Sequence, residues 1–147
     1  MNIAIYGRKV NKQNVSLFRR IIELVEHFGW SPILEEEFKK QYVKKTGLGQ
    51  DYRVFNSHHD LQGGIDFAIS VGGDGSFIKT VNYIRNSGVP ILGVNTGRLG
   101  FLANVNPENF EFALSQVKDK KFEFQKRSML RIHTADNLFG EDNFALN

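Results

Sequence analysis

The sequence predicts an α/β protein with a Rossmann-like parallel sheet and flanking helices. Over residues 1–121, short apolar runs typical of strands alternate with segments whose apolar residues recur at helical spacing. Two glycine-rich turns, at 72–75 and 95–100, each follow an apolar run directly. This alternation favours a sheet covered by helices on both faces, in which ligands gather at the carboxyl ends of the strands.

Composition narrows the class of protein. With 147 residues and 13 Phe the chain can bury the core of one ordinary domain. The net charge is +3, but the basic residues are dispersed among acidic ones, so we expect no nucleic-acid partner. No apolar stretch is long enough to span a bilayer and no signal peptide opens the chain, so we expect a cytoplasmic location and no membrane partner. The absence of cysteine excludes disulfides and thiolate zinc sites.

The first half of the predicted domain begins with a strand at Asn2–Tyr6. A helix is expected from Asn14 up to Gly29, because apolar side chains recur there every three or four residues. Trp30–Leu34 predicts the second strand. Glu35–Lys45 is charged and fits either a helix or a loop.

The segment from Thr46 to Gly64 lacks periodicity and predicts an irregular, mobile connection near the site. Order returns with a buried strand at Ile65–Val71, the turn GGDG, and a helix from Ser76 to about Arg85. Further apolar runs follow at Val89–Val94 and Phe101–Val105. Asn106 and Pro107 then suit the cap and first position of another helix.

The pattern changes after Lys121. Alternating residues at Met129–Thr134, a turn rich in Asn, Asp and Gly, and a last apolar run predict a hairpin. We therefore interpret residues 122–147 as the beginning of a second, β-rich domain that is truncated at Asn147.

The first glycine turn is the main candidate for chemistry. Glycines let the backbone approach a ligand closely, and the amide groups at the start of the next helix favour an anion. We expect Gly72, Gly73 and Ser76 to bind phosphate, and Asp74 to be catalytic by accepting a proton from a substrate hydroxyl or orienting a metal-bound phosphate. A plain strand-to-helix turn capped by Asp74 is the competing interpretation.

Two standard nucleotide-binding signatures are absent. No GxGxxG occurs, and Ile78 stands where a Walker loop requires its second glycine. Lys79 is therefore expected on the helix, where it either reaches a phosphate or ribose or lies solvated on the surface.

Three residues outside that turn complete the candidate site. Asn95 opens the second turn, NTGRLGFL, and offers hydrogen bonds beside a phosphate. Phe101 either lies against a purine or ribose or packs in the core. Arg8 follows the first strand and is either a phosphate clamp or half of a surface ion pair. The run His58–Asp60 lacks the spacing of a metal site, and no metal ligand is expected.

Together, GGDGS at 72–76, NTGRLGFLANV at 95–105 and ALN at 145–147 resemble the NAD kinase family. The resemblance implies transfer of a phosphoryl group from ATP, or inorganic polyphosphate, to the adenosine-ribose 2′-hydroxyl of NAD, giving NADP. It implies that Asp74 is the catalytic aspartate. The NAD-binding residues that it implies are Asp74, Gly75, Lys79, Phe101 and Asn147.

The resemblance also implies Mg²⁺ or another divalent cation carried with ATP, and a homo-oligomer when the protein is full length. The acidic residue expected after Asn147 and the family's β-rich second domain lie beyond the sequence, so we expect this fragment alone to be inactive. Two alternatives stay open. Lipid and sugar kinases share the GGDG turn, and the chain fits a non-catalytic nucleotide-binding module as well.

Overall fold

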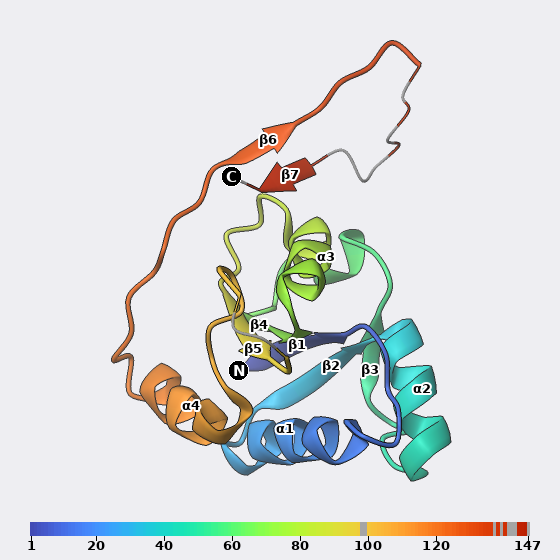
Figure 1. Cartoon of the computed structure of the whole chain (residues 1–147), viewed down its shortest axis with the longest axis vertical. Coiled ribbons are helices and arrows are strands. Elements are labelled where there is room, and N and C mark those ends of the chain that lie inside the picture. The colour runs from blue at the N-terminus through green and yellow to red at the C-terminus, as the bar shows by residue number, and fades with distance from the viewer. Residues whose placement is uncertain (98–99, 137, 139, 141–143, 147) are drawn as a thin grey trace.

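A parallel five-stranded sheet forms the centre of the molecule, with the strand order β3-β2-β1-β4-β5 (Figure 1). The computed structural model describes residues 1–97, 100–136, 138, 140 and 144–146. The strands are β1 (Asn2–Gly7), β2 (Ser31–Glu35), β3 (Arg53–Phe55), β4 (Phe67–Gly72) and β5 (Ile91–Asn95). The predicted α/β class with a parallel sheet is confirmed.

Helices cover both faces of this sheet (Figure 1). The helices are α1 (Val15–His27), α2 (Glu36–Thr46), α3 (Asp74–Ile84) and α4 (Phe110–Lys118), with 3₁₀ turns η1 (His59–Leu61) and η2 (Pro107–Asn109). The larger apolar cluster contains side chains of α1, α2 and α4, whereas the smaller one includes Ile84 of α3 on the opposite face. Among the described residues, no helix is both long and apolar enough to cross a membrane.

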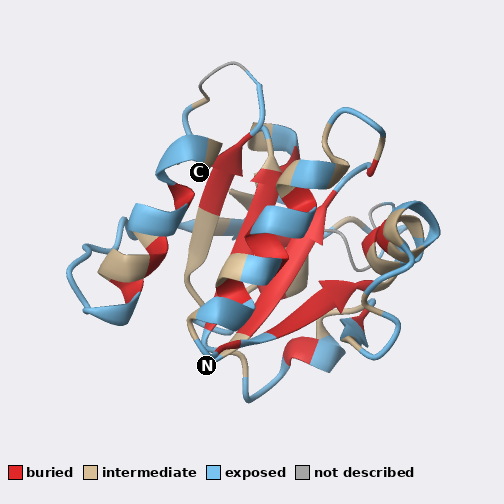
Figure 2. Cartoon of the chain, turned by 90° about the horizontal axis from the view of Figure 1, so that it is seen from below, coloured by how far each residue is buried: buried red, intermediate tan, exposed pale blue. Residues whose placement is uncertain are grey.

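Alternation along the strands creates the two clusters. In β1, Ile3 and Ile5 belong to the larger cluster and Ala4 to the smaller one. Figure 2 shows the central strands as an almost continuously buried layer. Each fully buried Ile or Leu side chain contributes about 1.5–3 kcal/mol through the apolar area that it removes from water.

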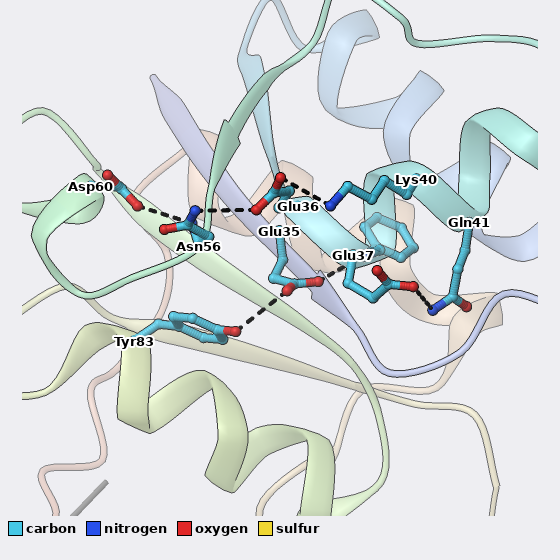
Figure 3. Close-up of polar contacts among 9 residues, drawn as sticks. Glu35, Glu36, Glu37, Lys40, Gln41, Asn56, Asp60 and Tyr83 are labelled. Carbon is cyan, nitrogen blue, oxygen red and sulfur yellow. Dashed lines mark hydrogen bonds and ion pairs between the residues drawn. The ribbon is translucent and has the colours of Figure 1, made fainter. Parts of the chain in front are cut away.

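The charged stretch after β2 is a helix because its start is capped. Glu35 is buried, and its Oε2 accepts the backbone N–H of Phe38 at 2.7 Å. Its other oxygen accepts the hydroxyl of Tyr83 from α3 at 3.4 Å (Figure 3). Gly47 ends the helix in the left-handed conformation, with φ of 71°.

The segment Thr46–Gly64 is more structured than predicted, since it contains β3 and η1. Asp60 organises the loop between them, because its Oδ2 accepts the backbone N–H groups of Asn56 at 3.0 Å and Ser57 at 2.9 Å. The Asn56 amide in turn donates to Glu36 of α2 at 3.1 Å (Figure 3). This loop is therefore tied to α2.

Two other boundaries differ from the prediction. Helix α3 begins at Asp74 and not at Ser76, so Asp74 lies in its first turn. In the apolar run Phe101–Val105, for which no element was specified, Val105 makes an isolated bridge to Val94. Pro107 opens η2 as expected, but the Asn106 side chain makes no capping hydrogen bond.

The expected hairpin is present at the end of the chain, where β6 (Met129–Arg131) pairs antiparallel with β7 (Phe144–Leu146). This small sheet lies on the α3 side of the molecule (Figure 1). Two guanidinium groups lie over the Phe144 ring, that of Arg85 at 5.3 Å and that of Arg131 at 5.5 Å from the ring centroid. The division into domains at residue 121 stays a prediction.

Candidate functional site

The carboxyl ends of three adjacent strands bring candidate residues to one edge of the sheet. Gly7 pairs with Val71, and Gly72 pairs with Asn95. Arg8 directly follows β1 at this end of the sheet. The register confirms that the two glycine turns share this edge, because Thr96 also donates its N–H to the Gly72 carbonyl at 3.2 Å.

The glycines of the first turn differ in backbone φ and in the space available for a side chain. Gly72 has φ of 149°, and a Cβ there would overlap the hydroxyl of the buried Ser76. Among the described residues, no heavy atom other than those of the chain neighbours lies within 4 Å of a Cβ added at Gly73 or Gly75. The N-cap residue of α3 is Gly73, which has no side chain to cap the helix. Space therefore lies open beside Gly73 and Gly75, next to the positive end of the helix dipole.

Asp74 joins the two turns through both of its carboxylate oxygens. Its Oδ2 accepts the backbone N–H of Phe101 at 2.9 Å. Its Oδ1 accepts those of Leu102 at 3.0 Å and Ala103 at 3.2 Å. We call this arrangement the Asp74 clasp, meaning the carboxylate together with the three amides of residues 101–103.

The clasp favours the ionised form of Asp74. Hydrogen bonds from Phe101, Ala103 and Leu102 lower the pKa of this carboxyl below its ordinary value, with a smaller contribution from the positive charge of Arg127. A carboxylate of this kind is a weak base for an alcohol. It is suited to orienting a hydroxyl and accepting its proton late in a reaction.

Asn95 is turned inward. Its side chain is buried, its Nδ2 donates to the Ala103 carbonyl at 3.1 Å and its Oδ1 accepts the N–H of Gly97 at 2.8 Å. These contacts shape the second turn from within, so the predicted phosphate contact of its side chain stays a prediction.

Phe101 lies on the surface, with 94% of its area exposed. The interpretation that places this ring in the core is therefore wrong. Its backbone is held by the Asp74 clasp while its ring stands free of the apolar clusters, available to a planar partner.

Lys79 is exposed on α3 and lines a polar hollow of about 230 Å³ with Asn82 of the same helix and residues 56–58. Arg8 is exposed, and its charge acts on Tyr6, where it opposes the effects of burial and Glu35 that raise the pKa of that phenol. Asn147 lies outside the described residues.

A larger hollow of about 600 Å³ runs along the edge strand β5, between α4 and residues 121–129. Its lining is mainly apolar, and none of the described candidate residues belongs to it. Sequence reasoning did not identify this hollow. It included Gly100 only as a glycine of the second turn, and the structure shows that Gly100 lies directly against the Asp74 carboxylate.

In the described part of the chain no three His, Cys, Asp or Glu side chains are grouped so as to hold a metal. In the run His58–Asp60, Asp60 is bound to backbone amides and His58 Nδ1 lies 3.1 Å from the Tyr83 carbonyl oxygen.

Known proteins with similar sequences were found along the whole chain. The NAD kinase of Flavobacterium psychrophilum is 36% identical over 100% of this chain and 51% of that protein. The NAD kinase of Bacteroides fragilis is 33% identical over 100% of this chain and 50% of that protein. The chain thus spans about half the length of these relatives.

Solved structures show the same fold. An NAD kinase from Archaeoglobus fulgidus in complex with ATP superposes with a TM-score of 0.64 at 26% identity, over 100% of this chain and 46% of that one. Yeast NADH kinase complexed with NADH gives a TM-score of 0.71 at 16% identity, over 88% of this chain and 41% of that one. At this identity the likeness shows a shared fold alone. The sequence profile of the ATP-NAD kinase N-terminal domain matches residues 3–122, and the chain therefore belongs to the ATP-NAD kinase family.

Proposed function

We propose that the complete protein transfers a phosphoryl group from ATP to the adenosine-ribose 2′-hydroxyl of NAD and so forms NADP. The observation that carries this proposal is the position of Asp74. It stands at the carboxyl end of β4, between two glycines with open space beside them, and it is bound to the turn that presents Phe101. A carboxylate that orients a hydroxyl beside a turn suited to phosphate fits phosphoryl transfer, and an exposed ring offers a stacking surface for a nucleoside.

The phosphate side of the proposed site is the turn at residues 72–76. Two observations support the approach of ATP or polyphosphate phosphates: the space that the described residues leave beside Gly73 and Gly75, and the glycine at the N-cap of α3. Gly72, Ser76 and Asn95 contribute by holding the shape of the two turns, and Arg8 supplies positive charge at the same edge.

The NAD side combines Asp74 and Gly75 with the exposed ring of Phe101, which stacks on the adenine or ribose. Lys79 and Asn147 complete the proposed NAD contacts. Lys79 lines a polar hollow with Asn82 and residues 56–58, which supports a contact with a polar part of NAD.

In the proposed reaction the 2′-oxygen of the ribose forms a bond to the γ-phosphorus of ATP. The bond between that phosphorus and the β,γ-bridging oxygen breaks, and ADP leaves. Asp74 orients the hydroxyl and takes its proton as the new bond forms. A divalent cation such as Mg²⁺ neutralises phosphate charge in this chemistry, and the described residues fit an ion held mainly by the nucleotide, since they form no acidic cage.

The remaining proposals concern the whole protein. We infer a cytoplasmic homo-oligomer whose α/β domain comprises residues 1–121, with residues 122–147 opening a β-rich domain. The likeness to a kinase crystallised with ATP supports ATP as a donor, with inorganic polyphosphate as the second candidate.

The test is a competition between acceptors. The complete protein is incubated with Mg²⁺, ATP labelled in the γ-phosphate and an equimolar mixture of NAD, diacylglycerol, sphingosine and fructose 6-phosphate. We expect label in NADP, identified with a dehydrogenase that uses only the 2′-phosphorylated cofactor. Label in a lipid or sugar phosphate, with none in NADP, would replace the proposal by another kinase activity that uses the GGDG turn.

A further inference from the structure

The Asp74 clasp depends on a residue that makes none of its hydrogen bonds. Gly100 precedes the three amide donors, and its Cα faces the carboxylate. A Cβ built on Gly100 would lie 2.6 Å from Cγ and 2.7 Å from Oδ2 of Asp74. Cβ atoms in proteins essentially never approach another heavy atom to less than 3.0 Å, and both distances are shorter than that. Any side chain at position 100 would therefore displace the carboxylate.

Backbone conformation does not explain this glycine. Gly100 does not lie in the left-handed region, in contrast to Gly47 with φ of 71° or Gly88 with φ of 77°. An L-residue can therefore adopt its φ, and the obstacle to a side chain is the space that the Asp74 carboxylate occupies.

The carboxylate cannot move aside without loss. Both of its oxygens are engaged, one by Phe101 and the other by Leu102 and Ala103. A shift of about 1 Å would lengthen these bonds beyond hydrogen-bonding distance and leave amide donors unsatisfied.

We propose that Gly100 is a positioning residue for Asp74: its missing side chain lets residues 101–103 close on the carboxylate, which fixes the catalytic group and the Phe101 ring relative to each other. As far as catalysis is concerned, this inference rests on the proposed function. The clasp itself can be tested without any activity.

The direct test is an NMR titration of Asp carboxyl ¹³C in the 147-residue chain and in two variants. We expect Gly100→Ala to move the Asp74 pKa up towards the ordinary aspartate value of 3.8. Gly97→Ala is the matched control in the same turn, because the nearest atom to its added Cβ is 4.0 Å away, and it should leave the Asp74 pKa low. Asp60, whose pKa is lowered by its own loop, reports whether each variant is folded.

An unchanged Asp74 pKa in Gly100→Ala, with Asp60 also unchanged, overturns the proposal. Should Gly100→Ala unfold, a pH titration of the backbone amides in the unsubstituted chain tests whether the clasp forms. The amide protons of Phe101, Leu102 and Ala103 must then shift together at the pH where Asp74 titrates, and the Gly97 amide must not. Independent behaviour of these amides also overturns the clasp.

The catalytic consequence is measured in the complete protein. Gly100→Ala should lower kcat for NADP formation by roughly 100-fold, because a small displacement of a reacting group has that effect, while KM for ATP changes little. A loss confined to KM, or no loss, contradicts the positioning role. If the unsubstituted protein forms no NADP, the proposed function is wrong. The titration then still tests whether Gly100 positions the Asp74 carboxylate.

Discussion

The carboxylate of Asp74 accepts the backbone N–H of Phe101 at 2.9 Å across 27 positions of sequence. This bond links the first turn of α3 to a residue whose ring is 94% exposed. The group proposed to accept the proton and the ring proposed to hold the acceptor nucleoside are thus parts of one hydrogen-bonded unit.

Phe101 and Phe110 should respond oppositely to truncation. Phe101→Ala removes an exposed ring, so we expect the free energy of unfolding to change by less than about 0.5 kcal/mol while KM for NAD rises. Phe110→Ala removes a ring that is 1% exposed and should cost about 3–5 kcal/mol. Urea denaturation of the chain and NADP kinetics of the complete protein measure the two effects, and equal destabilisation by both variants would place Phe101 in the core.

Gly75→Ala should stabilise the chain and impair the enzyme. Gly75 lies in α3, and the described residues outside its own helix leave the position of an added Cβ open, so alanine should raise the free energy of unfolding by up to about 1 kcal/mol. The same methyl group would fill the space proposed for phosphate and NAD, so KM for both substrates should rise.

Gly72→Ala is the contrasting variant for that experiment. It should destabilise the chain, because φ is 149° and the Ser76 hydroxyl occupies the space. Thermal unfolding gives the order of stability, and a Gly75→Ala enzyme with unchanged KM values would show that no ligand approaches at this turn.

Glu35 should stabilise α2 through its acceptor oxygen and not through its charge. Glu35→Ala removes the acceptor of the Phe38 N–H and should cost about 1 kcal/mol in the free energy of unfolding. Glu35→Gln keeps an acceptor oxygen and should retain most of that stability. Urea denaturation at neutral pH compares the two, and an equal loss in both variants would attribute the effect to charge.

Asp60 should contribute to stability at neutral pH and less in acid. Its pKa is lowered by hydrogen bonds from Asn56 and Ser57. A lowered folded-state pKa stabilises the protein above the unfolded value, and that contribution is lost as the pH falls through the folded value. Asp60→Asn should therefore be less stable at pH 7 and lose less stability below the ordinary value of 3.8. Parallel pH profiles for the two proteins would show that Asp60 has no part in acid unfolding.

The elements that the sequence predicted well have long apolar patterns. Helix α1 and the strands β1, β4 and β5 lie close to where periodicity placed them. Strand β3 was missed because three residues are too few to show alternation, and its pairing with β2 is what defines it. The charged helix α2 was left undecided because its cap is Glu35, which is not among the residues that usually begin helices.

The candidate site was predictable as far as strand ends determine it. Parallel strands bring Gly72 and Asn95 to one edge, as expected. The clasp was not predictable, because no pattern in the amino-acid sequence places the Asp74 carboxylate against Gly100. The sequence likewise gave no sign that Asn95 faces inward or that Lys79 lines a separate hollow.

The most direct test of the account is NADP formation by the complete protein, by Asp74→Asn and by Asp119→Asn. The Asp74 amide keeps one acceptor oxygen but turns an NH₂ group towards backbone donors, so both proton acceptance and the clasp are lost. We expect kcat to fall by about 10²–10⁴-fold. Asp119→Asn removes a carboxylate from an exposed ion pair with Lys121 and should leave kcat unchanged. An Asp74→Asn enzyme that is folded and forms NADP at the unsubstituted rate would contradict the central claim.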